Sequence, residues 1–210
     1  MKYLGKPAGM WALFAGSFEK HLTVEFDLTA GQAKDVAARA KKKYREIIAK
    51  LPEFDKRDRF EMNIVNCAML AAFILCMPQR PDIKTLTDYY AAAMMTPTMK
   101  AFCRASGKKK FTPKDIEGMK ATAKLRAGDR NPYSWSMDFF EYEDGSGYEA
   151  RFTTCGICTL MQVLGLYDLT PALCHLDYTM SEAGGASDFV REYTLASGGP
   201  YCDCGYHKKQ

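Results

Sequence analysis

The sequence contains no apolar run long enough to cross a membrane. Its longest mainly apolar stretch, residues 68–77, covers about ten residues, whereas a membrane helix needs about 20. No targeting signal is visible at the N-terminus either, because the apolar patch around Met10 is short and no cleavage site follows it. We therefore expect a cytoplasmic protein that does not have a membrane as partner.

A strong excess of charge is also absent. The 29 basic and 25 acidic residues leave a net charge of +4. Two short lysine runs, residues 41–43 and 108–110, lack the interleaved aromatic side chains of a nucleic-acid platform. We interpret them as a solvated helix face and a solvated loop, and we do not expect nucleic acid as a partner.

Histidine is scarce, and the familiar catalytic motifs are missing. The three histidines, His21, His175 and His207, are too scattered for a histidine-based metal site. There is no GxSxG, Walker, dinucleotide-binding or HExxH motif. Any chemistry must therefore rest on other residue types.

The first part of the chain has a helical pattern. Thr29 and Gln32 have the spacing of a capping box, which predicts an amphipathic helix that ends near Leu51 and Pro52. Further helices are predicted over residues 57–77 and 83–105, and another from Pro113 onward.

After about residue 130 the pattern changes. It predicts a hairpin with strands over 135–143 and 148–154, then a helix over 157–182 with an interruption near Pro171. Strands over 188–196 and 201–207 form a second hairpin. We predict an α+β fold in which a helical part, residues 1–130, packs with a hairpin–helix–hairpin unit, residues 131–210. The two parts form one compact domain with an antiparallel sheet.

The second hairpin allows a prediction of register. A loop of two or four residues within 197–200 places Arg191 opposite Tyr206. Because side chains alternate along a strand, Asp203 then lies on the face opposite to Arg191.

Cysteine is the residue type that stands out in the last third of the chain. Of the eight cysteines, those in this region are Cys155, Cys158, Cys174, Cys202 and Cys204. In a reducing compartment they are expected to be buried apolar side chains, ligands or reactive thiols rather than disulfides. The CxxC and CxC motifs together offer four thiolates to a structural zinc, and the CxxC alone offers a redox pair. We expect no cofactor, with zinc as the alternative.

Two aspartates accompany these cysteines. Cys174, Asp177 and Ser181 share one stripe of the predicted helix, beside an apolar stripe. A partly buried carboxylate needs a partner or a chemical role, and Asp203, which lies between two cysteines, poses the same question. Arg191 would pair with one of them or with a substrate carboxylate. Structural hydrogen bonds and a surface salt bridge are the alternatives.

Taken in order, these motifs resemble the L-2-amino-thiazoline-4-carboxylic acid hydrolase family. The resemblance spans about residues 150–207 and rests on the segments 153–157 (TTCGI), 173–178 (LCHLDY), 191–199 (REYTLASGG) and 202–203 (CD). The layout also resembles 4-vinyl reductase-type ligand-binding domains, in which two hairpins pack on a helix.

The family resemblance implies a small-molecule hydrolase that opens a cyclic C–N bond. Its substrate is a cyclic isothiourea with a carboxylate, and water adds at the carbon between sulfur and nitrogen. The implied catalytic residues are Cys155, Cys174, Asp177, Cys202 and Asp203. The implied substrate-binding residues are Arg191, Thr154 and Tyr178. The alternatives are a non-catalytic small-molecule-binding domain of the 4-vinyl reductase type and a zinc-stabilised module, and a homodimer is compatible with each of them.

Overall fold

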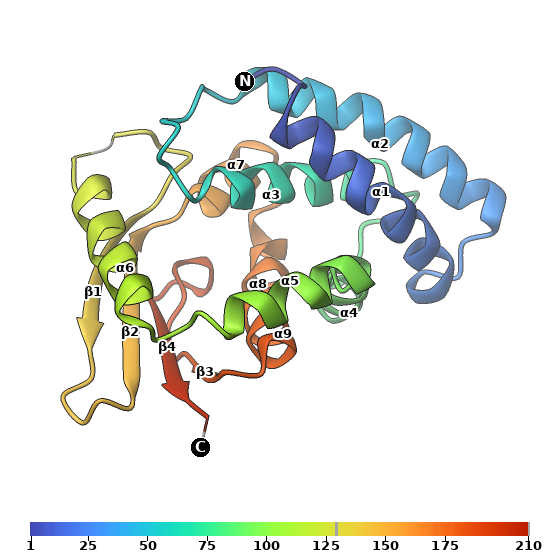
Figure 1. Cartoon of the computed structure of the whole chain (residues 1–210). Helices are drawn as coiled ribbons and strands as arrows, with labels where there is room; N and C mark the ends of the chain where they lie inside the picture. The colour runs from blue at the N-terminus through green and yellow to red at the C-terminus, as the bar shows by residue number, and fades with distance from the viewer. Residues whose placement is uncertain (129, 210) are drawn as a thin grey trace.

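The predicted α+β class is confirmed. The computed structural model of the chain describes residues 1–128 and 130–209. Helices dominate the first part, and a four-stranded antiparallel sheet with the order β1-β2-β4-β3 lies in the second (Figure 1). The elements are α1 (Lys6–Glu25), α2 (Ala30–Lys50), α3 (Glu61–Ile74), α4 (Ile83–Met94), α5 (Pro97–Gly107), α6 (Pro113–Arg126), β1 (Ser136–Glu141), β2 (Gly147–Thr154), α7 (Gly156–Val163), η1 (Tyr167–Leu169), α8 (Thr170–Cys174), α9 (Leu176–Gly184), β3 (Ser187–Val190), η2 (Leu195–Ser197) and β4 (Cys202–Lys208).

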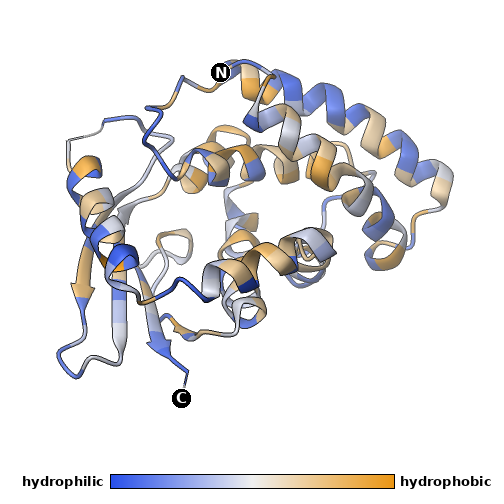
Figure 2. Ribbon diagram, in the orientation of Figure 1, coloured by the Kyte–Doolittle hydropathy of each residue, from blue (hydrophilic) through white to orange (hydrophobic). Residues whose placement is uncertain are grey.

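The predicted capping box opens α2. The Thr29 backbone N–H donates to Oε1 of Gln32 at 2.9 Å, and the Gln32 backbone N–H donates to Oγ1 of Thr29 at 3.3 Å. The apolar face of α2 packs inward and its charged face points outward, as Figure 2 shows. The helix α1 was not expected; the apolar patch around Met10 forms part of its buried face.

Two predicted helices are wrong in their extent. The helix expected over 83–105 is divided into α4 and α5, because Thr96 precedes Pro97 and is held in an extended conformation. The Thr96 side chain then caps α5 by accepting from the Met99 backbone N–H at 3.2 Å. The helix expected over 157–182 is broken near Gly165, whose φ of 69° ends α7 several residues before the predicted interruption.

The sheet presents one face to the helices. β2 lies between β1 and β4, with Phe139 opposite Ala150 and Ala150 opposite Cys204. Along the inner face, α6 packs near β1 and α9 packs near β3, so that the middle of the sheet lies between these two helices (Figure 1). The inward side chains of the two central strands alternate along the chain; they are Tyr148, Ala150, Phe152, Cys202, Cys204 and Tyr206.

The predicted register of the second hairpin is wrong by two residues. Phe189, not Arg191, lies opposite Tyr206, and β3 ends at Val190. The Asp203 carboxylate accepts the backbone N–H groups of Glu192 at 2.9 Å and Tyr193 at 2.6 Å. The Asp203 side chain thus satisfies two backbone N–H groups that would otherwise pair with β4. As a result, residues 191–201 form a connection between β3 and β4 that contains η2.

One hydrophobic core continues across the predicted boundary at residue 130. Side chains from α1 to α4 pack together with Trp135 and with residues of α7, α8 and α9. A smaller apolar cluster covers the inner face of the sheet. Across the described residues, we find no helix that combines the length and the apolar character required to traverse a bilayer.

Candidate functional site

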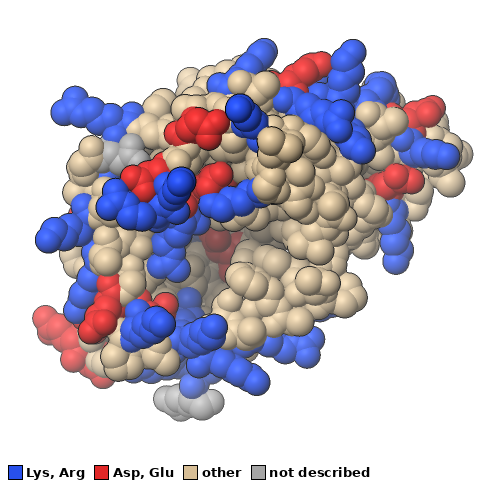
Figure 3. All heavy atoms as spheres, turned by 45° about the horizontal axis from the view of Figure 1, so that its top comes forward, with Lys and Arg blue, Asp and Glu red and all other residues tan. Residues whose placement is uncertain are grey.

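A cavity of about 460 Å³ lies between the inner face of the sheet and the surrounding helices. Its walls come from α3, α5, α6, α7, α8 and α9, and its floor is formed by β2 and β4. Figure 3 shows the corresponding hollow in the surface, with basic side chains along one side. A cavity of this volume is in the range that binds small molecules.

Cys155 lies between the end of β2 and the start of α7. It is the N-cap residue of α7, so its side chain is next to the unsatisfied N–H groups of the first helical turn. The following residue, Gly156, has no room for a side chain because the Tyr133 backbone carbonyl lies against it. The close backbone approach therefore fixes the start of α7 and holds the Cys155 thiol at the cavity wall.

The surroundings of Cys155 favour its thiolate. Hydrogen bonding from the Cys158 thiol lowers the Cys155 pKa, and the backbone N–H groups of Cys158 and Ile157 and the Trp135 side chain add to the effect. Burial acts in the opposite direction but is outweighed. The pKa of the Cys158 thiol is correspondingly raised, because it donates to Cys155 and is buried.

The other cavity cysteines remain neutral thiols. Burial raises the pKa of Cys174 to about 12, although the Arg191 guanidinium opposes the shift. Burial likewise raises the pKa of Cys103, Cys202 and Cys204. A buried neutral thiol is a weak nucleophile, so these side chains shape the cavity whereas Cys155 offers a reactive sulfur.

Arg191 and Asp177 form an ion pair in the cavity wall. Nη1 of Arg191 donates to Oδ2 of Asp177 at 2.8 Å, and Nη2 donates to the Cys174 carbonyl at 2.6 Å. Nη1 also lies 3.8 Å from Sγ of Cys204. The Arg191 side chain is only 5% exposed, so its position is set by these contacts.

Asp177 is enclosed by the protein yet open to the cavity. Its side chain retains 45% exposure because it faces the cavity space. Burial within the protein raises the pKa of this carboxyl, although the Arg191 guanidinium pulls it down. A carboxyl with a raised pKa can exchange a proton near neutral pH more readily than an exposed aspartate.

The cavity brings together most of the residues predicted as a site. Its walls include Cys155, Cys174, Asp177, Arg191 and Cys202. Their catalytic roles stay a prediction.

Three further predicted residues lie outside the cavity lining. Asp203 holds the loop after β3, as described above. The Thr154 hydroxyl accepts the Ser136 backbone N–H at 2.7 Å, and the Tyr178 hydroxyl lies 3.5 Å from the Arg191 carbonyl. The geometry therefore gives these side chains structural contacts, with Tyr178 and Asp203 supporting the segment that carries Arg191.

Lys110 lines the cavity, contrary to its expected place in a solvated loop. Its Nζ lies 3.4 Å from the centroid of the Tyr206 ring. Burial lowers the Lys110 pKa to about 8, although Asp115 opposes the shift. The next residue, Phe111, has a φ of 63°, a conformation that is unusual for a bulky side chain and that turns the chain just after Lys110. Sequence alone offered no signal for this turn beyond the nearby cap of α6.

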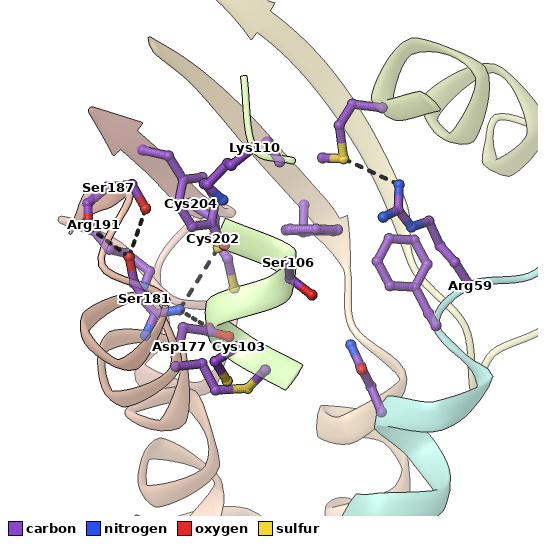
Figure 4. A pocket seen from close by; sticks show the side chains of 18 of the residues that line it. Arg59, Cys103, Ser106, Lys110, Asp177, Ser181, Ser187, Arg191, Cys202 and Cys204 are labelled. Carbon is purple, nitrogen blue, oxygen red and sulfur yellow. Dashed lines mark hydrogen bonds and ion pairs between the residues drawn. The ribbon is translucent and has the colours of Figure 1, made fainter. Parts of the chain in front are cut away.

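Arg59 also lines the cavity and was not singled out by any motif. Figure 4 shows it across the cavity from Arg191 and Asp177. Each of the eight cysteines, all of which the structure describes, is a free thiol. Within residues 1–128 and 130–209, no group of three or more histidine, cysteine or acidic side chains is placed to hold a metal ion.

Comparison with known proteins adds the family. The model of the L-2-amino-thiazoline-4-carboxylic acid hydrolase family matches residues 57–206. The chain belongs to this family. Searches of curated proteins and of solved structures found no match.

The extent of the family match is informative about the site. Every residue that lines the cavity, from Arg59 to Tyr206, lies within the stretch matched to the L-2-amino-thiazoline-4-carboxylic acid hydrolase family. The helices α1 and α2 lie outside that stretch and pack against α3. The cavity therefore lies within the part of the chain that matches the family model.

Proposed function

We propose that this protein is a small-molecule hydrolase that opens a cyclic C–N bond, with the cavity as its active site. The observation that carries the proposal is the Cys155 thiol, placed at a helix N-terminus inside the cavity with a lowered pKa. A thiolate in such surroundings is a competent nucleophile. The family membership supplies the substrate type, a cyclic isothiourea with a carboxylate.

In the first step, the Cys155 thiolate attacks the ring carbon between sulfur and nitrogen. The bond between that carbon and the ring nitrogen breaks; the nitrogen leaves as an amine with one proton from the exocyclic amino group, which becomes an imine, and one proton from an acid. Asp177 is suited to deliver this proton, because its raised pKa keeps a fraction of the carboxyl protonated. The product of this step is an enzyme-bound thioimidate attached through Sγ of Cys155.

In the second step, water adds to the same carbon and the Cys155 thiolate departs. Asp177, now ionised, accepts the proton from the water. The net reaction adds one water to the substrate and breaks one C–N bond. Arg191 contributes positive charge near the substrate carboxylate, and the neutral thiols of Cys174 and Cys202 form the wall beside the nucleophile.

The test is turnover of L-2-amino-thiazoline-4-carboxylic acid, followed by mass spectrometry as a gain of one water. Cys155→Ser should lower kcat by about a thousandfold or more, and Asp177→Asn by about a hundredfold or more. Cys76→Ser is the matched control, because Cys76 is a buried thiol outside the cavity. Intact-protein mass spectrometry of the unaltered protein, quenched with acid during turnover, should also detect the thioimidate adduct.

Two outcomes would contradict the proposal. Unchanged turnover in Cys155→Ser would remove the nucleophile from the mechanism. Saturable binding of the thiazoline without turnover by the unaltered protein would favour the alternative of a non-catalytic ligand-binding module.

A further inference from the structure

Lys110 lies at the end of the cavity formed by Tyr148 and Tyr206, where the negative charges of Asp115 and Asp177 act against the effect of burial on its pKa. Nζ of Lys110 lies over aromatic rings, 3.4 Å from the Tyr206 centroid and 5.3 Å from the Tyr148 centroid. Among the described residues, no carboxylate forms an ion pair with it. The nearby Asp115 carboxylate instead accepts the Phe111 backbone N–H at 2.9 Å and the Tyr148 hydroxyl at 3.2 Å.

Arg59 supplies a second cation to the same cavity. Its Nη1 contacts Sδ of Met119 at 3.4 Å and Oγ1 of Thr122 at 3.5 Å, both uncharged partners. Like Lys110, it forms no ion pair with a carboxylate of the described residues. Arg59 is exposed, so water solvates its charge, whereas Lys110 is half-buried and its ammonium gains more from a bound anion.

The sheet register separates Lys110 from the nucleophile. At one end of the floor Phe152 lies opposite Cys202, close to Cys155, and at the other end Tyr148 lies opposite Tyr206, beneath Lys110. Four residues of strand, at about 3.3 Å each, place the two ends about 13 Å apart. Figure 4 shows Lys110 and Cys202 along this floor.

A thiazoline carboxylate is too short to use both ends. Its carboxylate carbon is three covalent bonds from the reacting ring carbon, which gives a span of at most about 4 Å. The cavity of about 460 Å³ is also in the range that accommodates much larger ligands. The middle of the floor is apolar, with Ala150 between the two ends.

We infer that the substrate of this chain is an extended molecule with a distal anionic group about 13 Å from the reacting carbon, bound by Lys110 and Arg59. An apolar linker crosses Ala150 and joins the two ends. The inference rests on the proposed function for the identity of the reacting end, and on the two cations for the other end.

The protonation of Lys110 agrees with this assignment. Burial lowers its pKa to about 8, and a bound anion would stabilise the charged ammonium and raise that pKa. Binding of the anion therefore takes up protons near pH 8, and the affinity should fall as the pH rises above 8.

The first experiment measures how chain length affects alkylation of Cys155. The reagents are iodoacetamides whose amide nitrogen carries a straight alkyl chain ending in a carboxylate, a phosphonate or a neutral hydroxyl. For the anionic reagents, the rate at Cys155 should be highest near about six methylene groups, the length that spans 13 Å. At that length it should exceed the rate of the shortest anionic reagent about tenfold.

Substitutions of Lys110 and Arg59 test whether these two cations cause the preference for long reagents. Lys110→Met or Arg59→Gln should reduce the ratio of long to short rates toward one, whereas Lys109→Met, at the exposed neighbouring lysine, should retain it. A carboxylate preferred over a phosphonate would indicate a distal carboxylate, and the reverse a distal phosphate. A rate independent of chain length, or a preference that survives in the Lys110→Met/Arg59→Gln double variant, would overturn the inference.

The second experiment does not need a reactive Cys155. Non-reactive acetamides of the same chain lengths are added to the Cys155→Ser protein, and acetylation of Lys110 by acetic anhydride is followed by mass spectrometry. Anionic acetamides of about six methylene groups should slow acetylation of Lys110 about tenfold, with Lys109 as the internal control. Equal protection by the hydroxyl-terminated compounds, or none by the anionic ones, would overturn the inference even if Cys155 proves to be the nucleophile.

Discussion

Cys155 and Cys158 are two thiols in one helical turn with opposite protonation preferences. Cys158 donates to Cys155, so the same interaction lowers the pKa of one thiol and raises that of the other. Such pairs concentrate negative charge on the sulfur at the helix N-terminus. The CxxC spacing therefore places the donor thiol of Cys158 beside Cys155 at the start of α7.

The first prediction concerns the pH dependence of Cys155. Alkylation by iodoacetamide, followed at Cys155 by mass spectrometry, should rise with pH and level off below the ordinary thiol pKa, because the thiolate persists there. In Cys158→Ala the inflection should move to higher pH, since the largest stabilising interaction is lost. Cys76→Ala is the control, and an unchanged inflection in Cys158→Ala would contradict the account.

The second prediction separates the two roles considered for Asp203. If it holds the loop, Asp203→Ala should reduce the free energy of unfolding by about 1–3 kcal/mol, measured in urea, because two backbone N–H groups lose their acceptor. Asp203→Asn should have a smaller effect, because its side chain keeps one carbonyl oxygen. A loss of turnover without a change in stability would instead support the catalytic role implied by the family resemblance.

At the residue scale, sequence reasoning selected cavity-lining residues that stand in motifs. Cys155, Cys174 and Asp177 could be selected because they stand in short ordered patterns. Lys110 could not, since it closes a run of three lysines whose neighbours are exposed. Its burial depends on the turn at Phe111 and on rings contributed by distant strands, which no local pattern encodes.

At the scale of elements, α5 and α9 meet at glycine. A Cβ on Gly107 would overlap the backbone carbonyl of Gly184, so the two helices approach more closely than other residues would allow. Both glycines also line the cavity. The contact therefore sets the width of one cavity wall.

The third prediction tests this contact with two glycine substitutions of opposite effect. Gly107→Ala should reduce the free energy of unfolding by about 1–3 kcal/mol, because α5 must move away from α9. Gly118→Ala, in α6 with open space around it, should leave stability unchanged or raise it by up to about 1 kcal/mol. Urea unfolding measures both, and a stabilised Gly107→Ala protein would contradict the account.

Element boundaries show where local sequence signals are sufficient. The Thr29 capping box and the first hairpin are confirmed, because each depends on residues close in sequence. The second hairpin is shifted because Asp203, a residue within β4, competes for the backbone of residues 192 and 193. Such a long-range contact outweighs the turn preference of the Gly198–Gly199 segment.

At the scale of the whole molecule, a buried ion pair joins the segment before α3 to the end of α6. Arg126 at the end of α6 donates from Nη1 to Oδ2 of Asp58 at 2.9 Å, and each side chain is 1% exposed. The same carboxylate oxygen accepts the Ser134 hydroxyl at 2.6 Å. The cluster fixes the segment before α3, which carries Arg59, relative to the segment that leads into β1.

The fourth prediction concerns this cluster. Asp58→Asn should reduce the free energy of unfolding by about 1–3 kcal/mol, because the buried hydrogen bonds that Asp58 accepts from Arg126 and Ser134 lose the carboxylate charge. Asp55→Asn removes a carboxylate from an exposed pair with Arg57 and should leave stability unchanged. Thermal and urea unfolding measure both variants, and equal effects would contradict a special role for the buried pair.

The alanine in the middle of the cavity floor has a consequence for how the family can diverge. Ala150 is buried and has larger side chains on both sides. Its small volume therefore leaves space that connects the two ends of the cavity. A leucine or phenylalanine at position 150 would block the middle of the cavity. The remaining space around Cys155 would then admit only compact rings. On the proposed function, one substitution at Ala150 would restrict the cavity to short substrates while every proposed catalytic group stays in place.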